Sequence, residues 1–147
     1  MFKKLMGTDE NLSGTILRIL LGAVMLPHGA QLVLGMFGGG GLKASLNMFQ
    51  TAFHIPIYLA IAAILAPSLG ALALIAGFFT RLAALGIAIF MGMAVYLVHW
   101  KIGFFMNWMG NQKGEGFEYH ILAIAIALAL MIRGGGRWSV DRAIAGK

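Results

Sequence analysis

Cysteine is absent from the 147 residues, which excludes disulfides, thiolate metal sites, iron–sulfur clusters and thiol redox chemistry on this chain. Charge is also scarce: Asp, Glu, Lys and Arg make up 11% of the residues, whereas about 25% is usual in a soluble domain. So little charge excludes an ordinary water-exposed surface, and the high apolar content excludes intrinsic disorder. With 5 acidic residues against 11 basic ones, the net charge of +6 favours loops that face anionic lipid over a nucleic-acid surface.

What the chain does contain is apolar. Hydrophobic residues make up 60% of it, and glycine accounts for 21 positions without the three-residue period of collagen. Glycine in apolar helices lets neighbouring backbones approach closely. Three of these glycines, Gly14, Gly22 and Gly29, fall on a narrow arc of the first apolar stretch. The composition therefore predicts an integral membrane protein with closely packed helices, whose first partner is the lipid bilayer.

Four stretches without a charged side chain are the candidate membrane spans, with lengths of 24, 37, 19 and 14 residues. A transmembrane helix needs about 20 apolar residues, so the last stretch spans only if its flanking residues, Phe117 and Glu118 among them, are included. The first stretch is too long for the apolar part of a cleaved signal peptide. We predict an all-α, four-helix integral membrane bundle that forms one domain over residues 1–147, with helices near 13–35, 56–79, 82–101 and 117–133.

The basic residues predict the orientation, because short cytoplasmic loops carry an excess of Lys and Arg. With four spans, the side that holds both termini has eight basic residues and the other side has three. Both termini are therefore expected in the cytoplasm. The eight are Lys3, Lys4, Arg18, Arg81, Arg133, Arg137, Arg142 and Lys147, and the three are Lys43, Lys101 and Lys113. Arg18 lies near the start of the first helix, and its side chain is expected to extend to the membrane surface.

A run of four glycines, residues 38–41, predicts a break after the first helix. It begins an outer loop that is expected to run to about Ile55. Phe49, Phe53 and His54 give this loop an apolar side that we expect to lie on the membrane surface.

Polar residues within the bilayer cost free energy, so their positions are the informative ones. All four histidines map to the outer half of the predicted bundle. His28 and Gln31 share a face of the first helix, His99 ends the third, and Glu118 and His120 begin the fourth. This asymmetry predicts a polar chamber that opens to the outside, in which His28, His99 and Glu118 are the candidate proton carriers.

Each of these residues also has a structural explanation. His28 follows Pro27, which frees a backbone carbonyl within the helix, so its ring could satisfy that kink instead of a ligand. His120 is close enough to the interface to be a neighbour of lipid headgroups. Glu118 could form an ion pair with Lys113, Lys101 or, on the opposite side, Arg18. The outer aromatic residues form either an interfacial belt or a wall for a planar ligand, and they are Trp100, Phe104, Phe105, Trp108 and Phe117.

Several segments resemble the DoxX family of membrane proteins, and together they cover about residues 13–142. In the first span these are Arg18-Ile-Leu-Leu-Gly22 and Pro27-His28-Gly29-Ala-Gln31, followed by Phe37-Gly38-Gly39. Further along they are Gly70 to Gly77-Phe-Phe-Thr80-Arg81, His99 to Gly103-Phe104-Phe105, Gly116-Phe117-Glu118, and Gly134-Gly135-Gly136-Arg-Trp-Ser139-Val-Asp141.

The resemblance implies a four-helix protein of the bacterial or archaeal cytoplasmic (inner) membrane, related to the small subunit of thiosulfate:quinone oxidoreductase. Members are linked to quinone handling, oxidative stress or sulfur metabolism. Many of them carry a Glu in the second helix where this chain has Pro67-Ser68-Leu69-Gly70, which argues against a mechanism with two intramembrane carboxylates. The closing Ser139 and Asp141 are expected to cap the cytoplasmic end.

The leading hypothesis is a membrane redox component, as in a subunit of a quinone-linked oxidoreductase, that binds a quinone or similar apolar redox ligand. The contacts would be His28, Gln31, His99, Trp100, Trp108, Glu118 and His120. No redox centre is encoded, so a protein partner would supply or accept electrons, and a homodimer is a further candidate assembly. A haem held by His28 and His99 is disfavoured, and no other metal site is expected.

The alternative is a non-enzymatic membrane scaffold or assembly subunit of a larger complex. Solute transport is disfavoured because the sequence shows no inverted repeat.

Overall fold

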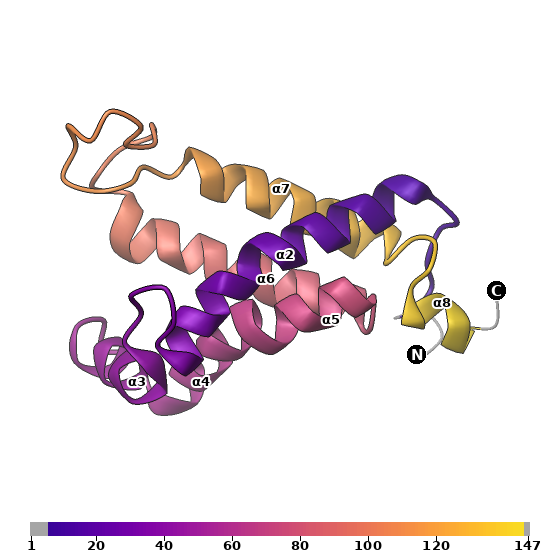
Figure 1. The fold of residues 1–147 in the computed structure, drawn as a ribbon, viewed down its shortest axis with the longest axis horizontal. Coiled ribbons are helices and arrows are strands. Elements are labelled where there is room, and N and C mark those ends of the chain that lie inside the picture. The colour runs from indigo at the N-terminus through magenta and orange to yellow at the C-terminus, as the bar shows by residue number, and fades with distance from the viewer. Residues whose placement is uncertain (1–5, 146–147) are drawn as a thin grey trace.

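The structure is a computed structural model that describes residues 6–145, so the predicted basic residues Lys3, Lys4 and Lys147 lie outside the described part. Within that part the chain forms helices and turns without a strand (Figure 1). The helices are α2 (Leu12–Leu34), α3 (Gly41–Thr51), α4 (Ile57–Leu65), η1 (Ala66–Gly70), α5 (Ala71–Ala76), α6 (Thr80–Ala94), η2 (Val95–His99), α7 (Glu118–Arg133) and α8 (Val140–Ala145).

Three helical rods are long and apolar enough to cross a membrane. They are α2, the continuous α4–η1–α5 rod (Ile57–Ala76) and the continuous α6–η2 rod (Thr80–His99). Helix α7 has 16 residues, or about 24 Å of helix, and is the shortest of the four long segments. Each rod, and α7 as well, leaves large apolar side chains exposed, including Leu20, Leu72, Ile89 and Leu122. Apolar side chains exposed on every rod are what contact with lipid requires, because lipid tails solvate them and water does not.

Figure 1 shows that the two ends of the molecule differ. Helix α8 and the segment before α2 lie at one end, where α5 finishes and α6 begins. Helix α3 and the long connection between η2 and α7 lie at the other end. We call these the terminal end and the loop end.

Helix α2 begins after Asn11, whose side chain accepts a hydrogen bond from the Gly14 N–H, and it ends at Gly35 in a left-handed conformation (φ 71°). Pro27 lies inside this helix without ending it. The backbone at Gly35 can adopt this conformation because glycine has no Cβ. The expected break after the first helix therefore begins three residues before the four glycines.

Helices α2 and α5 approach each other closely through glycine. A Cβ at Gly29 would lie 2.5 Å from Ser68 Cα, and one at Gly22 would lie 2.8 Å from the Ala71 carbonyl oxygen. The approach at Gly29 is to η1, a π-helical turn that contains Pro67. Close packing through the glycines of the first span is thereby confirmed.

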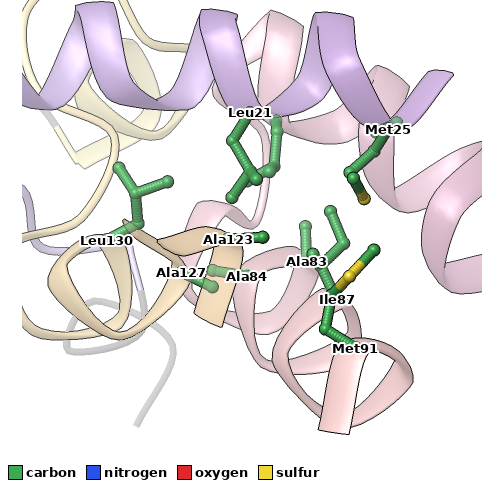
Figure 2. Close-up of a cluster of buried hydrophobic side chains, with 11 residues drawn as sticks. Leu21, Met25, Ala83, Ala84, Ile87, Met91, Ala123, Ala127 and Leu130 are labelled. Carbon is green, nitrogen blue, oxygen red and sulfur yellow. The ribbon is translucent and has the colours of Figure 1, made fainter. Parts of the chain in front are cut away.

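The core lies between α2, α5, α6 and α7 (Figure 2). Leu21 and Met25 point from α2 toward α6 and α7, while Ala84 and Ala127 meet where α6 faces α7. Alanine at this contact allows the two helices to lie close together, as small residues do in membrane bundles.

The outer loop contains a helix that the sequence analysis did not expect. Helix α3 buries Ser45 and Phe49, four residues apart, and Phe49 packs with Ala60 and Ile64 of α4. The prediction that Phe49 lies on the membrane surface is therefore wrong, because its ring fills a small core beneath α3.

Candidate functional site

The loop end gathers most of the polar residues that the sequence singled out. His99 ends η2, Glu118 and His120 begin α7, and His28 lies in the half of α2 that points to the same end. The connection of residues 100–117 joins η2 to α7 above them.

His99 is positioned by the π-helical end of the third rod. The Trp100 N–H donates to the carbonyl of Val95, five residues earlier, at 2.8 Å, and this wider turn is the one that carries His99. The His99 Nδ1 lies 2.7 Å from the Glu115 carbonyl oxygen. Since a carbonyl can only accept, Nδ1 carries the hydrogen, and Nε2 of a neutral ring is left as the acceptor.

His99 and His120 lie against each other. Their ring centroids are 4.2 Å apart with an angle of 43° between the planes, so the third rod and α7 meet through two imidazoles. His120 is 6% exposed, and its Nδ1 has no hydrogen-bond partner among the described residues. A buried polar atom without a partner costs about 1–3 kcal/mol, so this atom is a candidate for contact with a ligand.

Tyr119 was missed by the sequence analysis. Its hydroxyl is buried without a hydrogen-bond partner in the described part of the chain, and its ring lies 5.4 Å from that of His120. The sequence feature that could have identified Tyr119 is its position between Glu118 and His120. Tyrosine is common at membrane interfaces, however, so its presence there does not by itself indicate a binding site.

Glu118 holds the connection over the helix ends. Its Oε1 accepts hydrogen bonds from the Met106 N–H at 3.0 Å and from Trp108 Nε1 at 3.4 Å. The Glu115 carboxylate accepts a hydrogen bond from the Asn107 N–H at 2.7 Å, within the same connection. The ion pairs found in residues 6–145 both involve Glu10, so the alternative of an ion pair of Glu118 with a nearby lysine or arginine is not observed.

Aromatic rings form one wall at this end. Trp100 stacks on Phe117 with centroids 5.5 Å apart and planes 13° apart, and Phe104 meets Phe117 edge-on at 5.6 Å. A hollow of about 560 Å³ borders Trp100 and is also lined by Tyr96, Leu97 and Lys101.

Three predicted residues lie outside this pair of imidazoles. His28 is exposed, yet it is close enough to act electrostatically on His120. Gln31 Nε2 donates to the Phe37 carbonyl at 3.1 Å and so stabilises the turn after α2. His54 is exposed in the turn between α3 and α4.

The terminal end holds a second polar network, centred on Arg18. This side chain is 2% exposed and donates to the carbonyls of Leu74, Ile75, Gly135 and Trp138. The prediction that Arg18 extends to the membrane surface is wrong, because the end of α5 and the loop before α8 supply acceptors for its guanidinium inside the protein.

Asp141 and Ser139 cap helices at this end. Both Asp141 oxygens accept backbone N–H groups at the start of α6, from Phe79 at 2.7 Å and from Thr80 at 2.8 Å. Ser139 Oγ accepts the Arg142 N–H at 3.2 Å. The expected capping role of the two residues is confirmed, although Asp141 caps α6 and not its own helix.

No group of three or more His, Asp or Glu side chains within residues 6–145 is arranged to hold a metal ion. The hydrogen-bonded imidazole of His99 and the buried Nδ1 of His120 are groups that can form hydrogen bonds and transfer protons.

Comparisons with known proteins give one match. The family model described as DoxX matches residues 14–100, more than half of the chain, from the first turn of α2 to the end of the third rod. No curated protein and no solved structure matches.

Proposed function

This chain belongs to the DoxX family, and from that membership we propose a multi-pass membrane redox component that binds a quinone or similar apolar redox ligand at the loop end. The ligand would lie against His99 and His120, with a protein partner as the source or acceptor of electrons. The protein would work in the cytoplasmic membrane of a bacterium or archaeon.

The proposed topology has four crossings with both termini in the cytoplasm. Support comes from the three rods that are long and apolar enough to cross, together with α7, which lies alongside α6 in the same bundle. The terminal end carries five arginines in the described part of the chain, whereas the loop end carries three lysines. The arginines are Arg18, Arg81, Arg133, Arg137 and Arg142. Such an excess is typical of the cytoplasmic side.

The observation that carries the ligand proposal is the buried Nδ1 of His120, which lacks a partner next to a second imidazole. A quinone offers two carbonyl oxygens that accept hydrogen bonds and a flat ring that stacks on aromatic side chains. The residues present fit such a group: His120 Nδ1 would donate to a carbonyl, and Trp100 with Phe117 would supply an aromatic surface.

When bound, a quinone supplies two-electron, two-proton chemistry. The chain itself would hold and move protons. The Glu115 carbonyl fixes a hydrogen on His99 Nδ1, so His99 Nε2 is the atom that takes up a proton. Glu118 keeps the connection of residues 100–117 in place through Met106 and Trp108, which would limit the access of water.

A binding measurement tests the proposal. Purified full-length protein in detergent would be titrated with decylubiquinone, and binding followed by quenching of tryptophan fluorescence. His120→Gln and His99→Gln are expected to weaken binding about tenfold or more, because each removes a polar contact to the ligand. His54→Gln is the matched control, since His54 is an exposed histidine between α3 and α4, outside the imidazole pair. Equal binding by all four proteins would contradict the proposal.

The less favoured cofactor, a haem held by His28 and His99, is tested by the absorption spectrum of the same preparation. A Soret band that disappears in His28→Gln would favour it.

A non-enzymatic scaffold is the second candidate, and a specific observation favours it. Three polar residues at the loop end form side-chain hydrogen bonds with the backbone of this chain, as residues with a structural role do. They are Gln31, Glu115 and Glu118. A scaffold predicts that His99→Gln and His120→Gln leave quinone binding unchanged while altering the recovery of a partner complex.

A further inference from the structure

A separate hollow lies at the terminal end, at the opposite end of the bundle from the imidazole pair. It has a volume of about 360 Å³ and is lined by Glu10, Arg137, Trp138, Ser139, Arg142 and Ala143. It lies between the segment that enters α2 and the start of α8, at the end of the bundle where α2 and α6 begin and α5 and α7 finish. In a membrane-spanning bundle this is the level of the lipid headgroups.

The backbone beneath this hollow is firmly anchored. The Arg137 N–H donates to the Asn11 carbonyl at 3.1 Å, and the Arg137 carbonyl accepts from Thr15 Oγ1. The next carbonyl, that of Trp138, accepts from buried Arg18 at 2.8 Å. Because these backbone groups are held on the interior side, the side chains of Arg137 and Trp138 are displayed on the outside.

Trp138 has an exposed side chain that is attached to a strained backbone. Its φ of 56° lies in the left-handed region, which costs a residue with a Cβ of the order of 1–3 kcal/mol, and its side chain is 73% exposed. The Arg137 guanidinium lies 5.9 Å from the centre of its ring. Exposed tryptophan beside arginine is the combination that membrane proteins place at the headgroup level.

The charge of the hollow suits a phosphodiester. Glu10 lies 2.9 Å from Arg142 and 3.7 Å from Arg137, so one carboxylate is shared by two guanidinium groups and the group as a whole carries one positive charge. The hydrogen bond from Arg142 lowers the pKa of the Glu10 carboxyl, because it stabilises the ionised form. Guanidinium groups bind phosphate oxygens as they bind carboxylate oxygens.

We propose that this hollow binds the phosphodiester headgroup of an anionic phospholipid, with Arg137 and Arg142 on the phosphate and Trp138 at the level of the glycerol backbone. The exposed apolar side chains of Leu12 and Ile16 on the adjoining turn of α2 continue the surface into the region of the acyl chains. This apolar surface favours a lipid over a free phosphate or an acidic peptide, because only the lipid has acyl chains to lie against it.

Native mass spectrometry of the full chain tests the proposal. The protein would be incubated with phosphatidylglycerol or with phosphatidylcholine of the same acyl chains. Wild type is expected to retain phosphatidylglycerol at least tenfold better than phosphatidylcholine. The double variant Arg137→Gln/Arg142→Gln is expected to lose about tenfold in phosphatidylglycerol binding, as two arginines near an anionic surface predict. Glu10→Gln is expected to strengthen binding, because it removes the competing carboxylate.

The matched control is Lys43→Gln/Lys113→Gln, which removes the same two charges from exposed sites at the loop end. Equal loss in both double variants would overturn the proposal, since it would show an effect of net charge alone. Equal binding of the two lipids would also overturn it. Displacement of the lipid by millimolar inorganic phosphate would assign the hollow to a soluble phosphate ligand instead. Circular dichroism of each variant shows whether the helices have formed, and Glu10→Gln provides a test that removes neither arginine.

Discussion

The Asp141 carboxylate accepts a hydrogen bond from the backbone N–H of Thr80 at the first turn of α6, 61 residues earlier in the chain. Its other oxygen accepts from the neighbouring Phe79 N–H. The last helix thus supplies the N-terminal cap of the third membrane rod. Negative charge at this position also interacts favourably with the dipole of α6.

Asp141→Asn is expected to lower the free energy of unfolding by about 2 kcal/mol, because it removes the charge and one of two acceptors at a buried helix start. Thermal unfolding of the detergent-solubilised protein measures this. Asp9→Asn is the control, since Asp9 is exposed and should change stability by less than about 0.5 kcal/mol. Equal effects of the two substitutions would contradict the capping role.

Arg18→Lys is expected to destabilise the protein by about 3 kcal/mol or more. An ammonium group cannot reproduce a planar fork that reaches carbonyls on α5 and on the loop before α8. Resistance to unfolding by sodium dodecyl sulfate is a suitable measurement for a membrane protein. Arg133→Lys, at an exposed position of the same end, should have little effect on stability. A loss of stability as large as that of Arg18→Lys would contradict the role of the buried guanidinium.

Gly29→Ala is expected to lower the free energy of unfolding by about 1–3 kcal/mol, because the new Cβ would meet the backbone of η1, which cannot move aside as a side chain would. Gly92→Ala provides the opposite case, since nothing lies within 4 Å of its Cβ. There the substitution should be neutral or stabilise the helix by up to about 1 kcal/mol. The difference in melting temperature between the two variants checks the close packing of α2 on η1.

The Glu10 ion pair predicts a pH dependence at the terminal end. Arg142 lowers the pKa of the Glu10 carboxyl below its ordinary value of 4.5, first through a hydrogen bond and then through its charge. A lowered pKa in the folded state gives a contribution to stability that is present above the ordinary value and lost as the pH falls through the lowered one. The protection factors of the α8 amides, in which the intrinsic pH dependence of hydrogen exchange is divided out, should therefore fall on acidification in wild type and change less in Glu10→Gln. Identical pH profiles would show that the pair does not hold α8 in place.

Much of the membrane architecture was predictable from the sequence. The uncharged runs gave helix positions that agree with the observed helices to within a few residues. The reason is that an apolar run long enough to cross the bilayer can form all its backbone hydrogen bonds within itself only as a helix. Helix α3 was not predicted. Its glycine-rich start and polar residues resemble a loop, and only the packing of Phe49 onto α4 shows why the segment is helical.

The sequence by itself determined which polar residues share an end of the bundle, because the direction of each crossing follows from the order of the spans. It placed His99 and His120 at one end and Asp141 at the other. Only the tertiary structure decided which of them meet. His99 contacts His120 because α6 packs along α7, and Arg18 is buried because acceptors from segments 56 to 120 residues away surround it. Such contacts depend on how each helix is rotated about its axis and at what angle two helices cross. The packing of side chains between helices determines both, whereas the periodicity of a single helix determines neither.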